Sequence, residues 1–396
     1  MAFDIQDTFA SLAGIAPIET RAILKVNGEK YSRWKSISID QSIVQISGSF
    51  SFTTANIHSG NNERWNITTG DRCEIEVAGK TVITGYIDDI DNGYDLGSHD
   101  ITFGGRDKTA DLVDCTFDVN PEPEIRSVGS FPYVPPAGEG EFKNLSFLQI
   151  IEKLCKPFDI DVVLDTELLS DSALFAVIAE YKPETGSMVY EEIATFCQQY
   201  GVLPISIGDG TLYITRAGSV RANDTLEAGV NIKSASLNQS DTERYSVYYV
   251  EGIAKTTVFN QKSSAFGSLT DDYVKRYRPL YILAGEQAVN NAACQRRAAW
   301  EARVRAGASR KVEMSVYKWT QTNGDVWPLN GVVPVKDDKI GVVGDRLIAG
   351  IDLTIDNNGG ELTKLSLVPP DTFALKERVP IPNETDTLWD DIRNLK

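Results

Sequence analysis

Hydrophobic and polar residues alternate at every second position near the start of the chain, which is the pattern of half-buried β-strands. The alternation is clearest over residues 36–40 and 49–53. Asn27-Gly28 lies between two further runs and predicts a tight hairpin turn, because both residue types tolerate positive φ. Short strands separated by frequent turns are typical of β-sandwiches and barrels. We therefore expect residues 21–116 to form a first β domain.

A second β pattern follows residue 222. It is clearest over residues 245–250 and returns over residues 311–370, where turns rich in glycine and asparagine separate the runs. The longest expected helix, residues 285–306, lies between these runs. We expect residues 223–375 to form a second β domain that includes this helix. We detect no repeat in the sequence, so whether the two β regions share a fold stays open.

Residues 117–222, between the two β regions, have a different pattern. They include a loop rich in proline and glycine at residues 119–140. Ser146 and Gln149 then form a capping box in front of an apolar run with helical spacing, and a second helical run ends at Gly201. Short β patterns alternate with these helices, which indicates an α/β insert domain. The whole chain is therefore expected to be α+β and mainly β.

Both ends of the chain show helical spacing outside these domains. Residues 1–20 predict a short helical arm, which is either a docking element or a packed terminus. Residues 376–396 contain two prolines and then Leu388, Trp389 and Ile392 on one helical face. A lone amphipathic segment of this kind docks either on its own domain or on a partner. We expect a partner interface at these three residues.

The net charge limits the possible partners. The 396 residues carry 39 basic and 56 acidic side chains, for a net charge of −17. A chain this acidic is a poor binder of nucleic acid by phosphate neutralisation, because its field repels the phosphate backbone. Acidic walls would suit a surface that DNA passes without binding, although solubility alone is the simpler explanation.

The expected helix 285–306 is basic within this acidic chain. Arg296, Arg297 and Arg303 are among its cations. They form either a solvated face with local ion pairs, each worth little, or a patch complementary to an acidic neighbouring subunit. We favour the second interpretation and expect a partner interface at these arginines.

Candidate chemistry is sparse. The sequence contains no HExxH, GxSxG or Walker motif, and its two histidines, His58 and His99, both lie in turn-like contexts. Residues 104–109 resemble a phosphate loop but lack its spacing. The acidic cluster at residues 88–95 does not match a calcium loop and is interpreted as a turn with solvated carboxylates. We therefore predict no catalytic residue, no metal site and no cofactor.

Cysteine and hydropathy patterns bear on the compartment. The five cysteines are scattered and form no CxxC pair, which indicates free thiols in a reducing cytoplasm. No apolar run reaches the roughly 18 residues of a membrane-spanning helix, so no membrane insertion is expected. The first residues carry acids and no early basic cluster, so no secretory signal is expected.

Three segments give the chain a resemblance to a known family. The first contains Val26-Asn27-Gly28, Tyr31, Trp34-Lys35, Ser42-Ile43 and Gly48-Ser49-Phe50. The second and more specific is Gly105-Arg106-Asp107-Lys108-Thr109-Ala110-Asp111-Leu112-Val113-Asp114-Cys115. The third runs from Trp327-Pro328 through Gly341 to Gly344-Asp345-Arg346-Leu347-Ile348. In this wording and order the chain resembles the baseplate hub proteins of Mu-like contractile phage tails, also described as the late-control family.

The resemblance implies a structural protein of the virion tail and no enzyme. Such a hub is a homotrimer whose subunits each carry two tail-tube-like β-barrel domains with an insert between them. Its six barrels match the hexameric tail-tube protein, and its true three-fold symmetry matches the central spike protein. DNA passes through its channel without specific binding, and other baseplate proteins surround it. The resemblance also implies assembly in the cytoplasm of the bacterial host.

Two other classes of function stay open at the level of sequence. One is a tail-associated enzyme that degrades the cell wall, and the other is a carbohydrate-binding adhesin. The absence of a catalytic motif argues against the first. A tailocin or another contractile injection system would use the same hub as a phage, and the sequence does not separate these.

Overall fold

The computed structural model describes residues 22–55, 65–94, 96, 99–117, 142–183, 186–255, 262–285, 290–356 and 360–373. The helical arm expected at residues 1–20 therefore lies outside the described residues. So do almost all of the expected proline-rich loop and the tail at residues 376–396.

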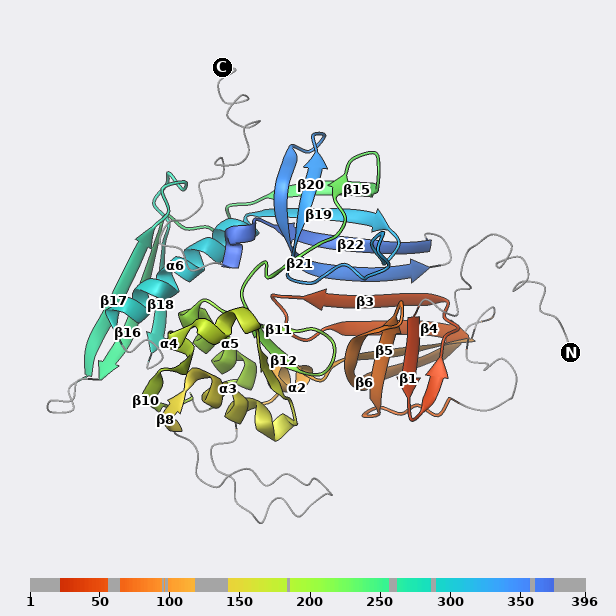
Figure 1. Ribbon diagram of the computed structural model, residues 1–396, viewed down its shortest axis with the longest axis horizontal. Helices are drawn as coiled ribbons and strands as arrows, with labels where there is room; N and C mark the ends of the chain where they lie inside the picture. The colour runs from red at the N-terminus through yellow and green to blue at the C-terminus, as the bar shows by residue number, and fades with distance from the viewer. Residues whose placement is uncertain are drawn as a thin grey trace, which may run out of the picture.

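The largest element is one sheet whose strands come from both β regions of the sequence (Figure 1). Its N-terminal strands are β1 (Ala22–Val26), β2 (Glu29–Tyr31), β3 (Ser36–Ser42), β4 (Ser49–Ala55), β5 (Arg72–Val77), β6 (Lys80–Tyr94) and β7 (His99–Asp107). Its C-terminal strands are β13 (Val220–Arg221), β14 (Leu226–Glu227), β15 (Ile232–Gln239), β19 (Arg310–Tyr317), β20 (Gly331–Asp337), β21 (Val342–Asp356) and β22 (Gly360–Val368). The main path runs β15-β19-β22-β21-β3-β4-β7-β6-β5-β1-β2.

The local sequence explains why these strands form. In β3 and β4 the apolar residues are buried and their neighbours are partly exposed, as the alternation predicted. The turn between β1 and β2 places Asn27 at φ 51° and Gly28 at φ 82°. Two consecutive positive φ values define a type I′ turn, whose twist matches that of the flanking strands. The predicted hairpin is confirmed.

The same antiparallel pairing scheme occurs twice in this sheet. In the first copy β3 pairs with β4, β4 with β7, β7 with β6 and β6 with β5. In the second copy β15 pairs with β19, β19 with β22, β22 with β21 and β21 with β20. We call strands β3 to β7 the N-module, and β15 with β19 to β22 the C-module. The two β regions therefore share a topology that no sequence repeat had revealed.

The long strands β6 and β21 occupy the same place in the two modules. Each has 15 residues and pairs with the preceding strand through its first half and the following strand through its second half. Each also shifts register midway, between Ile87 and Asp89 in β6 and between Ile348 and Gly350 in β21. Counting from these shifts makes Asp352 of β21 the equivalent of Asp91 of β6.

A seam between β3 and β21 joins the modules edge to edge. The pairing is antiparallel and runs from Gly350 opposite Ser42 to Ile355 opposite Ile37. Figure 1 shows β3 and β21 side by side where the two halves of the chain meet. Two separate barrels were expected. Within the described residues, no strand pairing closes either module, and the two modules share one sheet instead.

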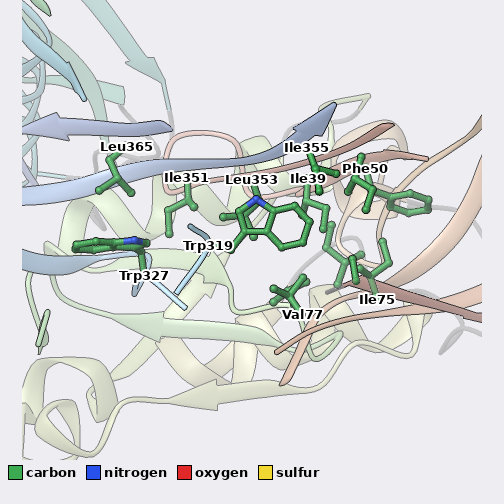
Figure 2. Packing of buried hydrophobic residues seen from close by; sticks show 14 of the residues in the cluster. Ile39, Phe50, Ile75, Val77, Trp319, Trp327, Ile351, Leu353, Ile355 and Leu365 are labelled. Atoms are coloured by element: carbon green, nitrogen blue, oxygen red, sulfur yellow. The ribbon is translucent and has the colours of Figure 1, made fainter. Parts of the chain in front are cut away.

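A single hydrophobic core lies under both modules. Figure 2 shows Ile39 and Val77 of the N-module close to Trp319 and Leu353 of the C-module. Trp319 is 2% exposed, and its Nε1 donates to the carbonyl oxygens of Thr354 at 3.1 Å and Leu362 at 3.2 Å. The shared core explains the seam, because β3 and β21 each bury one face on it and would otherwise leave unpaired backbone groups at their edges.

The helices and short strands between the two modules, which we call the insert, pack around a hydrophobic core of their own. Its elements are α2 (Ala110–Asp114), β8 (Phe142–Ser146), α3 (Phe147–Cys155), η3 (Lys156–Phe158), β9 (Val162–Leu164), η4 (Thr166–Ser170), α4 (Ser172–Phe175), β10 (Val177–Tyr181), α5 (Val189–Tyr200), β11 (Leu203–Ser206) and β12 (Leu212–Thr215). Ser146 and Gln149 form the predicted capping box, and α5 ends at Gly201 in the left-handed region. Both local predictions are confirmed.

The second β region also contains a small separate layer. It consists of β16 (Val247–Lys255), β17 (Lys262–Thr270) and β18 (Pro279–Gly285), which pair only with one another within the described residues. Helix α6 (Asn291–Ala308) packs on this layer with its alanine side and ends beside η5 (Pro370–Phe373). The strand predicted at residues 245–250 belongs here and not to the main sheet. The helix predicted at residues 285–306 covers this layer.

Candidate functional site

One face of the main sheet carries polar side chains from both modules. Because side chains alternate along a strand, residues between the buried positions point away from the shared core. We call this surface the wall face. It comprises Ser36, Ser38, Asp40, Ser49, Ser51, Thr53, Asp89, Asp91, Thr102, Arg106, Ser234, Ser236, Asn238, Lys311, Glu313, Ser315, Asp352, Thr354, Lys364 and Ser366. Most of these side chains carry a hydroxyl group or a carboxylate, so the face is polar and built mainly from short side chains.

The cations of the wall face are bound to carboxylates. Lys311 and Lys364 contact Glu313 at 3.0 and 2.9 Å. The hydrogen bond to Glu313 raises the pKa of Lys364, and Asp352 adds to the effect. Arg106 Nε donates to Asp88 at 2.8 Å. Acidic groups outnumber basic ones among the wall residues, so the described face is neutral to acidic. Such a surface gives phosphate groups little to bind.

Two carboxylates face each other across the seam. Asp40 of β3 lies directly opposite Asp352 of β21. The pKa of Asp40 is raised to about 7, first by burial and then by the hydrogen bond and the charge of Asp352. When two carboxyl groups are in contact, repulsion disfavours ionisation of both, so the pair retains one proton to a higher pH than a single carboxyl group would. The seam therefore contains a group that titrates near neutral pH.

The Gly105–Thr109 motif ties the N-module to the insert. Asp107 is 2% exposed, and its carboxylate accepts from the backbone N–H groups of Gly48 at 2.9 Å and Thr109 at 2.8 Å. Burial raises the pKa of Asp107, while these hydrogen bonds oppose the rise. Lys108 Nζ donates to Asp159 Oδ2 of the insert at 2.9 Å. The motif is therefore a structural anchor between two units.

Arg106 adds a third tie in the same motif. Its two terminal nitrogens donate to the carboxylate of Asp114 at 3.1 and 2.7 Å, in the paired geometry that suits a guanidinium. The hydrogen bonds to Asp114 and then Asp88 raise the pKa of Arg106. Asp114 lies in α2, the first helix after β7, so the pair fixes the direction in which the chain leaves the sheet.

The arginines predicted as a partner interface contact their own chain. Arg296 Nε donates to the carbonyl oxygen of Gln199 at 2.9 Å, and Arg297 pairs with Glu301 at 2.9 Å. Arg303 is 2% exposed, and burial lowers its pKa. The structure thus brings these side chains to the contact between α6, the insert and η5. An interface of these residues with a partner stays a prediction.

The sequence also predicted a partner interface near the end of the chain. Leu388, Trp389 and Ile392 lie outside the described residues. The described part of the chain contains no group of three or more His, Cys, Asp or Glu side chains arranged to hold a metal ion. Among the same residues, no helix combines the length and the apolar character that crossing a membrane requires.

The acidic cluster at residues 88–95 was interpreted as a turn, and this was wrong for the part that is described. Asp88, Asp89 and Asp91 lie in the second half of β6. The error has a physical cause. This half of β6 pairs with β7 on one side only, and six of its seven residues are exposed, so its sequence lacks the alternation of a buried strand.

Sequence reasoning also missed the wall face and the seam, although one signal was present. Structural equivalence aligns residues 37–42, Ile-Ser-Ile-Asp-Gln-Ser, with residues 235–240, Ala-Ser-Leu-Asn-Gln-Ser. Three positions are identical, and Asp40 corresponds to Asn238. The match is too short to stand out against the whole chain, and the pairing pattern was needed to find it.

Comparison with known proteins agrees with this architecture. Residues 21–107 match the model of the N-terminal domain of Mu phage baseplate assembly protein GpP-like proteins. Residues 134–216 match the second domain of baseplate hub protein gp44-like proteins, and residues 290–376 match the fourth domain of Mu phage baseplate assembly protein GpP. The chain is 30% identical over 371 residues to baseplate hub protein gp44 of Escherichia phage Mu, which covers 92% of this chain and 90% of gp44. The chain belongs to the Mu-like baseplate hub family.

Solved structures agree with this family assignment. The 43 kDa tail protein of prophage MuSo2 from Shewanella oneidensis is 31% identical, with a TM-score of 0.72 over 89% of this chain and 99% of that protein. The tail protein from Neisseria meningitidis MC58 shares the fold, with a TM-score of 0.70 at 21% identity over 91% of this chain and 99% of that one. The resemblance inferred from the sequence is therefore confirmed, and the chain is a baseplate hub protein of a Mu-like phage tail.

Proposed function

We propose that this hub protein assembles as a homotrimer that joins a hexameric tail tube above it to a trimeric spike below it. The observation that carries the proposal is the twofold occurrence of the same five-strand pairing scheme within one chain. Three copies of the chain would present six similar modules. The role is structural, with no catalytic step.

The symmetry argument is geometric. Two closed rings meet well only when their contact surfaces repeat the same number of times. A six-fold tube and a three-fold spike do not satisfy this condition directly. A trimer with two tube-like modules per subunit is pseudo-six-fold towards the tube and three-fold towards the spike. The β3–β21 seam supports this, because it sets the two modules side by side in one sheet.

The wall face is the surface that we assign to the channel. Its hydroxyl groups and carboxylates would let DNA slide past, because the described residues of this face include no row of unpaired cations that could release counterions from the phosphates. The ion pairs of Glu313 with Lys311 and Lys364 support this, since they neutralise the lysines on the wall. A channel of this kind guides DNA without specific binding.

The remaining contacts are expected outside the ring. We propose that Leu388, Trp389 and Ile392 dock on the spike or on a neighbouring subunit, and that the exposed side of α6 around Arg296 faces another baseplate protein. Assembly in the host cytoplasm would suit the cysteines, which are all free within the described structure.

The test is the size and symmetry of the purified protein. Light scattering should give three times the chain mass of 43.6 kDa at micromolar concentration. Averaged electron micrographs viewed down the axis should show a ring with six similar lobes and three-fold differences among them. A stable monomer, or a ring in which the modules point away from a common axis, would contradict the proposal.

A further inference from the structure

We propose that the second half of β6 in one subunit pairs with β15 of the next subunit, so that the main sheet continues from one copy of the chain to another. The inference rests on the proposed ring and names the strand contact that would build it. It follows from the internal repeat, since the chain already contains one example of the contact at the β3–β21 seam.

Both strands have a side without a partner. The first half of β6 pairs with β5 on one side, and the second half, from Asp88 to Tyr94, pairs with β7 on the other. Beyond Tyr86, no described strand continues the β5 side. Strand β15 pairs with β19, and its opposite side has only a single bridge between Ile232 and Ala228 among the described residues. An edge of this length is a ready site for another strand.

The internal seam supplies the register. Strand β21 is the equivalent of β6, and β3 is the equivalent of β15. Transferring the pairs of the seam gives the expected contact between subunits. It pairs Asp89 with Ser240, Ile90 with Gln239, Asp91 with Asn238, Asn92 with Leu237, Gly93 with Ser236 and Tyr94 with Ala235. The pairing is antiparallel, like the seam from which it is derived.

Side chains on the core side fit this contact. Ile90 and Leu237 are half-buried and pack at the margin of the shared core. Tyr94 is 85% exposed in the single chain, and the register brings it opposite Ala235. The edge strand of a second subunit would cover this apolar surface. Core-side and wall-side residues would then alternate across the contact, as they do at the internal seam. At the seam, Ile351 corresponds to Ile90 and Ile39 to Leu237, and they are 3% and 0% exposed.

Charge selects the partner edge. The β6 edge carries Asp88, Asp89 and Asp91, so two β6 edges would repel each other. Strand β15 contains no acid and one cation, Lys233, and Lys311 lies opposite Asn238 on β19. An acidic edge therefore meets a neutral to basic one. This makes the contact head-to-tail, and a head-to-tail contact closes into a ring when the rotation allows it.

The test is disulfide trapping of the register in the full-length protein. Gly93→Cys and Ser236→Cys place two cysteines directly opposite each other on the wall side, within the reach of a disulfide. An added Cβ at Gly93 meets no atom within 4 Å, and Ser236 is exposed, so both substitutions should be tolerated. Cys115→Ser in all variants removes the partly exposed native thiol.

The matched control moves one cysteine by two residues on the same face. Gly93→Cys with Asn238→Cys keeps both thiols on the wall side but sets them diagonally. We expect the directly opposite pair to form intermolecular disulfides about tenfold faster than the diagonal pair, because a disulfide tolerates only a short Cα separation. Full oxidation should give a covalent trimer on a non-reducing gel, and either single variant should give none.

The outcomes separate this inference from the proposed function. A trimer by light scattering that fails to cross-link at Gly93 and Ser236, or cross-links equally in the diagonal variant, would overturn the strand contact and leave the trimer standing. A monomer without cross-links at high concentration would overturn both. Cross-linked chains longer than trimers would support the strand contact and contradict the three-copy ring.

Discussion

The carboxyl pair at the seam gives the sharpest prediction of the structure. The change is Asp40→Asn, which keeps the side-chain shape and lets an amide donate to Asp352 at any pH. The C-module edge β15 already has asparagine at the equivalent position, Asn238. The substitution therefore copies a solution that the chain itself uses, and we expect it to fold normally.

The direction in which stability changes with pH follows from the raised pKa of Asp40. Asp40 titrates at about 7 in the folded protein, against an ordinary value of 3.8. Between these values the folded chain holds a proton that the unfolded chain has lost, so stability falls as pH rises through this window. The rise in the pKa from 3.8 to about 7 sets an upper bound of about 4 kcal/mol on the loss of folding free energy across this window. Partial exposure and the nearby Lys311 screen the pair, so we expect about 1–2 kcal/mol.

The assay is urea unfolding followed by tryptophan fluorescence, which reports on the shared core through Trp319. Near pH 3.5, below the ordinary pKa of aspartate, the variant and the wild type should be equally stable. Near pH 8.5 Asp40→Asn should be more stable by about 1–2 kcal/mol, because it no longer carries a buried charge next to Asp352. Asp338→Asn, at an exposed turn, removes the same formal charge and serves as the control. A variant less stable than wild type at high pH, or an equal difference at both pH values, would refute the reasoning.

Three further predictions test other contacts. Gly105→Ala should destabilise the N-module by about 2–4 kcal/mol, because an added Cβ would lie 2.1 Å from the Tyr86 carbonyl oxygen. Gly93→Ala is the control and should fold like wild type, because an added Cβ there meets no atom within 4 Å. Thermal melts measure the stability of both variants against wild type. Arg244→Ala should cost about 3–5 kcal/mol in urea unfolding, since it leaves the 2%-exposed Asp271 without its ion-pair partner at 2.6 Å; little loss would mean that water reaches the pair. Deleting residues 383–396 should leave the fold intact and weaken assembly with the spike in a pull-down, and unchanged capture would rule out a docking tail.

Local features of the chain were readable from sequence because local physics determines them. The Asn27-Gly28 turn requires positive φ, and the capping box at Ser146 satisfies helix donors within four residues. The alternation in β3 and β4 follows directly from burial of one face. The second half of β6 was misread because a strand with an uncovered edge has no such alternation. The separate layer of β16 to β18 was missed because its strands have the same local pattern as those of the main sheet.

The sequence by itself determined the mainly β, α+β character, the capping box at Ser146 and the helix end at Gly201, and membership of the hub family through motifs such as Gly105–Thr109. Only the tertiary structure decided which strands pair: that β3 meets β21 more than 300 residues later, that Asp40 therefore lies opposite Asp352, and that two modules share one wall. The physical reason is that alternation specifies which face of a strand is buried, whereas backbone hydrogen bonds at a strand edge accept any partner of the right length. The shared core around Trp319 determines which strand edges pair, because it packs against strands of both modules.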